Sequence, residues 1–170
     1  MINLILDNIR SIHNVGSIFR TAETLGILKI YCIDTTPTPL DRFGNKRKDF
    51  AKVSLGAEDS IKWEHVGNGD TFEVSESLEL IKKLKKDGFK IISLEQAPNS
   101  VDYKDVDLSK YFKNSLEIKV AIILGNEVEG VSKELLKISD IIAEIPMRGQ
   151  KESLNVSISA GIFLFRLLDN

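Results

Sequence analysis

The residues best suited to chemistry lie in three short stretches that are far apart along the sequence. The first, NVGSIFR, places Asn14, Gly16 and Arg20 near the start of an amphipathic helix that we expect from about residue 14. Gly16 and Arg20 are four residues apart and share a helix face, so the guanidinium leans back over the bare backbone at Gly16. Helix N-termini also present free amides and a positive dipole end. We therefore expect a phosphate or oxyanion site here, with Gly16 keeping the surface open.

The same stretch also has a purely structural interpretation, which stays open at this point. In it, Asn14 only caps the helix, and Arg20 only pairs with Glu23 three residues further along. An apolar stripe at helical spacing explains the helix without any ligand. It does not explain Gly16, because a glycine inside a helix costs roughly 1 kcal/mol relative to alanine.

The second stretch, ILGNEVEGVS, begins where an apolar strand is expected to end. Gly125 and Gly130 bracket a turn in which the backbone can approach a ligand closely, and Asn126 and Glu127 place polar groups at its edge. Ser132 is a candidate N-cap for the next helix. The alternative interpretation is a plain strand-to-helix connection with solvated glutamates.

The third stretch, IPMRGQKESLNVSISAGIFLFRLL, ends in a helix that we expect over residues 153–168. The helix is apolar over most of its circumference and must be buried, in the core or against another subunit. A narrow polar stripe is made of Asn155, Ser159 and Arg166. Ser153 is placed to cap the helix or to contact a ligand, whereas Leu154 is expected to pack in the core. An amide on a buried helix needs a specific partner, which singles out Asn155.

Short apolar runs and helical patterns alternate along the chain between these stretches. The runs predict strands over residues 2–6, 28–34, 89–95, 120–124 and 140–146, and helices are expected over 76–86 and 133–137. Wholly apolar strands alternating with helices predict a single α/β domain with a mostly parallel sheet that is flanked by helices. In such sheets ligands bind beyond the carboxyl ends of the strands. The segments 94–96, 125–127 and 145–147 are three such ends, and they form one pocket if their strands are adjacent.

Composition excludes several classes of protein. With 170 residues, 42% of them hydrophobic, the chain is one ordinary domain without an apolar run long enough to cross a membrane, and its N-terminus does not resemble a signal peptide. The single cysteine, Cys32, predicts a buried structural thiol and a reducing, cytoplasmic location. Two histidines without clustered cysteines argue against a zinc site. No glycine-rich nucleotide motif is present, and a net charge of −2 neither indicates nor excludes RNA binding.

Taken together, the three stretches resemble the three motifs of the SpoU (TrmH-like) family of SPOUT RNA 2′-O-ribose methyltransferases. NVGSIFR resembles the first motif, Asn-x-Gly-x-x-x-Arg, and the other two stretches resemble the second and third in the same order, so the resemblance spans residues 1–170. It implies a SPOUT-type fold with a deep C-terminal trefoil knot, working as a homodimer. It also implies transfer of a methyl group from S-adenosyl-L-methionine to a ribose 2′-hydroxyl in tRNA or rRNA.

The resemblance assigns roles to particular residues by motif position. The cofactor pocket would use, largely through backbone groups, Leu94, Gly125, Ile145 and Leu154. Arg20 would be the catalytic arginine, reaching a site formed mainly by the other subunit. The residues that position Arg20 and the ribose would be Asn14, Glu127, Ser153 and Asn155. Because a guanidinium stays protonated, we expect Arg20 to stabilise the developing 2′-alkoxide or to anchor a phosphate, and we leave the general base open.

The sequence leads directly into the first strand, so we expect one methyltransferase domain and no separate RNA-binding domain. RNA capture would then use the catalytic dimer, including the basic loop Arg42–Lys52, which has five basic and two aromatic residues. This loop has the alternative interpretation of a solvated surface segment. Two alternative functions stay open, a non-catalytic knotted RNA-binding relative and a methyltransferase that acts on a base nitrogen. No metal and no membrane partner is expected.

Overall fold

The chain folds around one seven-stranded sheet in a computed structural model that describes residues 1–67, 74–110, 112 and 117–169. The strand order is β3-β2-β1-β6-β4-β7-β5, and each pairing between these strands is parallel. The strands are β1 (Ile2–Asp7), β2 (Lys29–Ile33), β3 (Lys62–Val66), β4 (Lys90–Leu94), β5 (Val101–Asp102), β6 (Val120–Leu124) and β7 (Ile141–Glu144). The predicted α/β class with a mostly parallel sheet is confirmed.

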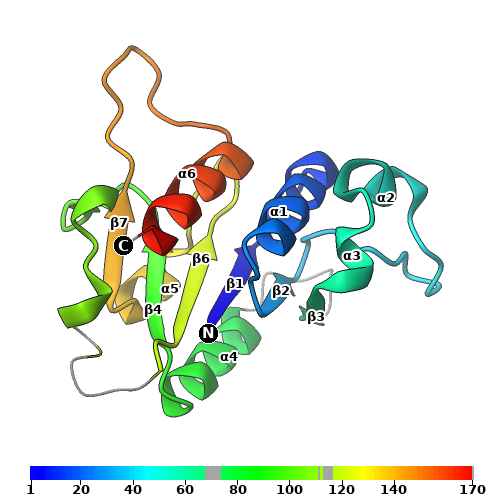
Figure 1. Ribbon diagram of the computed structural model, residues 1–170, viewed down its shortest axis with the longest axis horizontal. Helices are drawn as coiled ribbons and strands as arrows, with labels where there is room; N and C mark the ends of the chain where they lie inside the picture. Colours follow the sequence, from blue (N-terminus) through cyan, green and yellow to red (C-terminus); the bar gives the residue numbers. More distant parts are fainter. Residues whose placement is uncertain (68–73, 111, 113–116, 170) are drawn as a thin grey trace.

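Helices cover both faces of the sheet, as Figure 1 shows. They are α1 (Ile12–Thr24), α2 (Lys48–Ser54), α3 (Ala57–Ser60), α4 (Val74–Lys86), α5 (Lys133–Ile138) and α6 (Val156–Leu168), with 3-10 turns at Tyr103–Asp105 and Leu108–Lys110. Side chains from α1, α2, α3 and α6 share one apolar cluster with one face of the sheet. Side chains from α4 and α5 pack on the other face.

The central strands form because their residues are apolar on both sides. Every residue of β6, VAIIL, is buried, and β1 alternates Leu4 and Leu6 toward one helix layer with Ile5 toward the other. Cys32 is fully buried in β2, which confirms the prediction of a structural thiol. Burial raises the pKa of this thiol to about 12. The edge strand β3 is largely exposed, and its sequence contains no apolar run that would predict a strand.

Two expected boundaries are wrong. The last helix begins at Val156 and not at Ser153, because the side chain of Asn155 accepts a hydrogen bond from the Ser157 amide and caps the helix there. The basic segment Arg42–Lys52 is not all loop, since its last residues belong to α2. This helix forms because Phe50 is fully buried, with its ring edge-on to Phe19 at 5.1 Å between centroids.

Candidate active site

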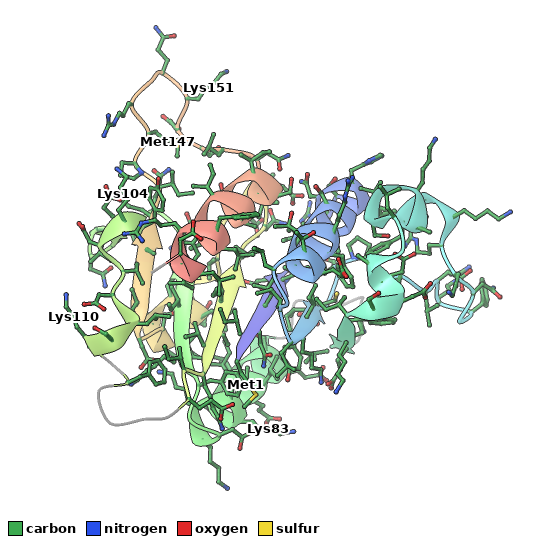
Figure 2. All side chains as sticks on the ribbon, viewed as in Figure 1. Met1, Lys83, Lys104, Lys110, Met147 and Lys151 are labelled. Carbon is green, nitrogen blue, oxygen red and sulfur yellow. The ribbon has the colours of Figure 1, made fainter. Side chains whose placement is uncertain are left out.

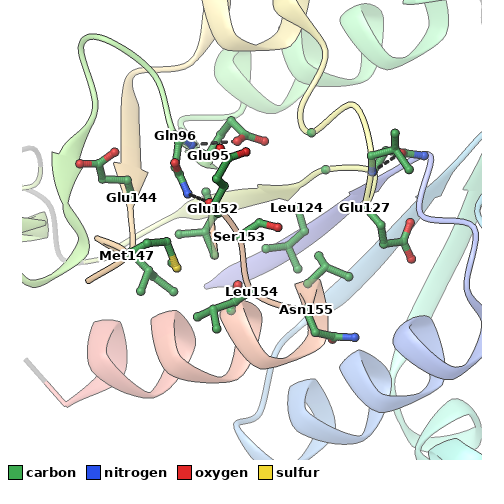
Figure 3. Close-up of a pocket in the computed structure, with 18 residues that line it drawn as sticks. Glu95, Gln96, Leu124, Glu127, Glu144, Met147, Glu152, Ser153, Leu154 and Asn155 are labelled. Carbon is green, nitrogen blue, oxygen red and sulfur yellow. Dashed lines mark hydrogen bonds between the residues drawn. The ribbon is translucent and has the colours of Figure 1, made fainter. Parts of the chain in front are cut away.

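A cavity of about 540 Å³ lies at the carboxyl ends of three neighbouring strands, β6, β4 and β7 (Figure 3). Residues from all three expected strand ends line it, and the segment before α6 closes its remaining side. The prediction that these ends form one pocket is therefore confirmed. All four residues expected to hold the cofactor line this cavity: Leu94, Gly125, Ile145 and Leu154.

The lining of this cavity is acidic. Four carboxylates contribute to it: Glu95, Glu127, Glu144 and Glu152. None of the lining residues is a lysine or an arginine. Leucines and an isoleucine supply apolar surface between the carboxylates, and Met147 lies beside them on the β7–α6 loop (Figure 3). Such a cavity favours a ligand that combines an apolar part with a positive charge over an anionic ligand.

Glu95 holds the turn after β6 against the end of β4. One carboxylate oxygen accepts from the Val131 amide at 2.9 Å, and the other accepts from the Gln96 amide at 2.8 Å. The Gln96 side chain in turn donates to the carbonyl of Glu152 at 2.6 Å, which fixes the segment before α6. Glu95 lies in one of the three expected strand ends, but no role was predicted for it. Its position directly after an apolar strand was the available signal.

Both glycines of the second motif are required by the packing of their own loop. A Cβ on Gly125 would lie 2.3 Å from the carbonyl carbon of Gly130, and Gly130 itself has φ +71°. The turn closes on itself through paired backbone hydrogen bonds between Asn126 and Gly130. The Asn126 side chain also donates to the carbonyl of Asn8 at 2.7 Å, which anchors the loop to the end of β1.

Three of the predicted catalytic residues form one hydrogen-bonded network at the rim of the cavity. Asn14 Nδ2 donates to Glu127 Oε1 at 2.8 Å, and Asn155 Nδ2 donates to Asn14 Oδ1 at 2.9 Å. The Glu127 carboxylate also accepts from the backbone amides of Arg10 and Ser11 at 3.2 and 3.3 Å. The network joins the start of α1 to two loops from the other half of the chain.

The electrostatics of Glu127 follow from these contacts. Partial burial raises the pKa of Glu127, but hydrogen bonds from the Asn14 side chain and from backbone amides outweigh it and hold this pKa below its usual value. The carboxylate therefore stays ionised at neutral pH beside the positive end of α1. A phosphate or oxyanion site at this helix end stays a prediction, but a carboxylate of the protein already lies beside it and takes the amides of Arg10 and Ser11.

Two capping assignments also change. Ser11 caps α1 by accepting from the Asn14 amide, so Asn14 is not the N-cap and its side chain is free to join the network. Ser132 has the expected N-cap position of α5, but its hydroxyl makes no cap bond; its amide donates to the buried carboxylate of Asp7 at 3.1 Å. Burial raises the pKa of Asp7, despite the lowering effect of that bond.

Gly16 does not keep a surface open. It is buried, and a Cβ at this position would lie 3.0 Å from Val53 Cβ and 3.5 Å from the carbonyl oxygen of Phe50. The reason for this glycine is the close approach of α1 and α2. Arg20 lies one turn further along α1 with an exposed side chain. Within the part of the chain that the structure describes, its guanidinium pairs with no carboxylate, so the expected pair with Glu23 is absent.

Ser153 and Leu154 belong to the segment that leads into α6. Both line the cavity, and neither is helical, so Ser153 does not cap α6. The expected core position of Leu154 is wrong, since its side chain is 41% exposed. The loop before them, with Met147 and Lys151, projects away from the sheet (Figure 2).

One face of α6 is exposed although the helix is apolar. Ala160, Phe163, Leu164 and Leu167 are buried against the sheet and α1, as predicted. The opposite side carries a stripe of large side chains, each at least 37% exposed: Ile158, Ile162, Phe165 and Leu168. The expectation of a helix buried all round therefore holds for only one face within a single chain.

Neither a membrane span nor a metal centre is found in the described parts of the chain. No helix there is long and apolar enough to cross a bilayer. No three histidine, cysteine or acidic side chains of the described residues come together in a group that could hold a metal ion.

The chain matches the model of the SpoU rRNA Methylase family over residues 1–165. It is 31% identical over 159 residues to the tRNA (guanosine(18)-2′-O)-methyltransferase of Aquifex aeolicus, covering 94% of this chain and 64% of that protein. A second relative, an uncharacterized tRNA/rRNA methyltransferase of Archaeoglobus fulgidus, is 33% identical over 164 residues, covering 96% of this chain and 62% of the relative. The chain thus spans slightly less than two thirds of these relatives' length.

Solved structures resemble this fold over nearly its whole length. The TrmH/SpoU tRNA modifying enzyme of Aquifex aeolicus superposes with a TM-score of 0.75 at 28% identity, covering 97% of this chain and 72% of that one. An AdoMet-bound rRNA methyltransferase from Sinorhizobium meliloti superposes with a TM-score of 0.79 at 25% identity, covering 97% of this chain and 54% of that one. From its three motifs, its fold and its match over residues 1–165, this chain belongs to the SpoU rRNA methylase family.

Proposed function

We propose that this chain is an S-adenosyl-L-methionine-dependent methyltransferase that modifies a ribose 2′-hydroxyl in tRNA or rRNA. The observation that carries the proposal is the cavity at the ends of β6, β4 and β7, with the Asn14–Glu127–Asn155 network at its rim. Family membership supports it, as do the named tRNA 2′-O-methyltransferase of Aquifex aeolicus and the AdoMet-bound structure from Sinorhizobium meliloti.

The cavity fits the proposed cofactor by its chemistry. S-adenosyl-L-methionine joins a flat adenine to a positively charged sulfonium, and the cavity joins apolar side chains to four carboxylates without a lysine or an arginine. Leu94, Ile145 and Leu154 offer apolar surface to the adenine, and the loop that begins at Gly125 offers backbone groups. When bound, the cofactor supplies an activated methyl group. The protein then has to align that methyl group with one ribose oxygen and exclude water.

In this proposal Arg20 acts as a fixed positive charge. Its exposed guanidinium has no carboxylate partner among the described residues and is available to the RNA. The guanidinium would stabilise the negative charge that develops on the 2′-oxygen, or hold a neighbouring phosphate, without losing its own proton. Asn14, Glu127 and Asn155 would orient the start of α1 relative to the cavity, and Ser153 would face the ribose from the segment before α6.

Arg20 does not line the cavity of its own chain, which supports a site that is shared between two subunits. We infer that the exposed apolar stripe of α6 is covered by a second copy, which brings Arg20 of one chain to the cavity of the other. A homodimer would also complete the burial that the apolar composition of α6 requires. The trefoil knot, a single methyltransferase domain over residues 1–170 and a cytoplasmic location remain part of the proposal.

The decisive experiment compares wild-type protein with Arg20→Ala on unfractionated tRNA and rRNA, using a methyl-labelled cofactor and nucleoside analysis of the product. The proposal expects 2′-O-methyl nucleosides from the wild type, and a loss of at least a hundredfold in rate for Arg20→Ala with cofactor binding unchanged by calorimetry. Methylated bases without 2′-O-methyl nucleosides would support a base-nitrogen enzyme. Cofactor binding below detection would overturn the proposal.

Mixed dimers test whether the site is shared. Arg20→Ala chains are combined with chains in which Leu154→Trp obstructs the cavity, each expected to be inactive alone. A shared site predicts that one of the two sites regains activity. No recovery at all would contradict the shared arrangement.

A further inference from the structure

The turn between β2 and α2 holds a fixed shape through the side chain of Asp41. One of its carboxylate oxygens accepts from the amides of Phe43 and Asn45 at 2.8 Å each, and the other accepts from the Asn45 side chain at 3.2 Å. The backbone adds a bond from the Asp41 amide to the Asn45 carbonyl at 2.8 Å, and Gly44 takes φ +81°. These bonds, led by the one from the Asn45 amide, also hold the pKa of Asp41 below its usual range.

The turn presents a large aromatic side chain to solvent. Phe43, at its tip, is 74% exposed, compared with 49% for Phe165 on α6. The Arg42 guanidinium lies over one face of the ring, 4.8 Å from its centroid. The ring has a cation on one face, while most of its surface is open to solvent. An exposed phenylalanine costs solubility and contributes nothing to this chain's core.

The turn and the helix α2 that follows it carry both paired and unpaired cations. Lys46 pairs with Asp59 at 2.7 Å, and Arg47 pairs with Asp49 at 3.3 Å. In contrast, Arg42, Lys48 and Lys52 pair with no carboxylate of the described residues. Figure 1 shows this segment beyond α2, on the side of α1 that faces away from α6. An aromatic ring flanked by free cations fits single-stranded nucleic acid, whose bases stack while its phosphates meet the cations.

We propose that Phe43 is a stacking platform for an unpaired base of the RNA substrate, held in position by the Asp41-closed turn; this rests on the proposed function. The Arg42 guanidinium covers one face of the ring and leaves the other face to the base. The guanidinium itself binds the adjacent phosphate or stacks on a neighbouring base. Lys48 and Lys52 contact the RNA backbone without selecting a sequence. Asp41 is a positioning residue and does not touch the RNA.

The first test measures binding of unfractionated, fluorescein-labelled tRNA by anisotropy at fixed salt. Phe43→Ala should weaken binding about 5- to 100-fold, and Phe43→Tyr should restore it to within about threefold. The matched control is Leu55→Asn, which removes another exposed apolar side chain, 64% exposed, at the far end of α2, where φ +53° suits asparagine. The control should change affinity by less than about twofold. An equal effect of Phe43→Ala and Leu55→Asn, or none from Phe43→Ala, overturns the proposal.

Replacing Asp41 distinguishes a turn that positions Phe43 from a simple patch of positive charge, because the two explanations predict opposite changes in RNA affinity. If the segment were only a patch of charge, Asp41→Ala would strengthen RNA binding, because it removes a negative charge near phosphates. If the turn positions Phe43, the same variant should weaken binding about 3- to 10-fold, and Asp41→Asn, which keeps an acceptor oxygen, should recover part of the loss. Stronger binding by Asp41→Ala refutes the positioning role.

A fluorescent variant reports stacking directly and separates this inference from the proposed reaction. Phe43→Trp should bind tRNA like the wild type, and its added tryptophan emission should be quenched on binding, with the wild-type signal of Trp63 as the background. Unquenched emission from a bound complex overturns stacking. Methyl transfer that survives in Phe43→Ala at saturating RNA leaves the proposed function intact. If the wild type binds tRNA through Phe43 but transfers no methyl group, only the proposed methyltransferase function is overturned.

Discussion

Replacing Gly16 by alanine tests whether this glycine lies on an open helix surface or in a close contact between two helices. The two explanations predict changes of opposite sign in the free energy of unfolding. On an open helix surface, Gly16→Ala would raise the free energy of unfolding by about 1 kcal/mol through helix propensity. In the structure, the added Cβ lies 3.0 Å from Val53 Cβ and 3.1 Å from Val53 Cγ1. Forcing a methyl group into a packed contact costs about 1–3 kcal/mol. The net expectation is a loss of about 1 kcal/mol, or a fall in Tm of about 2–4 °C.

The assay is urea unfolding followed by circular dichroism, with Ser17→Ala as the control. Ser17 is next to Gly16 on α1, and its hydroxyl makes no hydrogen bond among the described residues. Its replacement should therefore report the propensity gain alone, up to about 0.5 kcal/mol. In a Val53→Ala background, where one of the contacts is gone, the cost of Gly16→Ala should fall. A gain of about 1 kcal/mol from Gly16→Ala alone would refute the close contact between α1 and α2.

Three further expectations follow from the structure. Glu127→Gln should lower the free energy of unfolding by up to about 1 kcal/mol at pH 7. The pKa of Glu127 is lower in the folded protein than in the unfolded chain, so its ionised carboxylate stabilises the fold above about pH 4.3. This stabilisation is lost as the pH falls through the folded pKa. The urea midpoints of the wild type and of Glu127→Gln should therefore converge at lower pH. Cys32, with its pKa raised to about 12, should resist a thiol reagent at pH 8 until the protein is unfolded, and rapid labelling of the native protein would contradict its burial. Ile162→Lys, in the exposed stripe of α6, should shift the proposed dimer toward monomer in sedimentation velocity, whereas a wild type that is already monomeric at micromolar concentration would count against the dimer.

Sequence patterns predicted the elements whose stability is nearly local. The strands β1, β4 and β6 are short apolar runs, and a run that is buried on both faces has few alternatives to a central strand. The helix α2 was missed because it has only seven residues, and its anchor Phe50 depends on a contact with Phe19 in a different helix. The explanation of Gly16 failed for the same reason, since the side chain that excludes a Cβ comes from α2.

The location of the candidate site could be predicted from the sequence, but its hydrogen bonds could not. Its location was predictable, because carboxyl ends of adjacent parallel strands must meet at one edge of the sheet. Its hydrogen bonds were not, because Glu127 meets Asn14 across 113 residues and Asn155 meets Asn14 across 141. No local pattern determines which polar side chain reaches which, and so the helix end that looked free for a phosphate lies beside a carboxylate of the protein.

The strand order has a consequence for how the chain is made. β1 is synthesised before the other strands of this sheet but lies between β2 and β6, so one of its edges can pair early while the other waits for residues 120–124. Until residues 120–124 have been synthesised, the nascent sheet therefore carries an open strand edge, a feature that favours association with other chains. The bond between Asn14 and Asn155 forms later still. The hydrogen-bonded network at the rim of the cavity therefore cannot assemble before Asn155 has been synthesised.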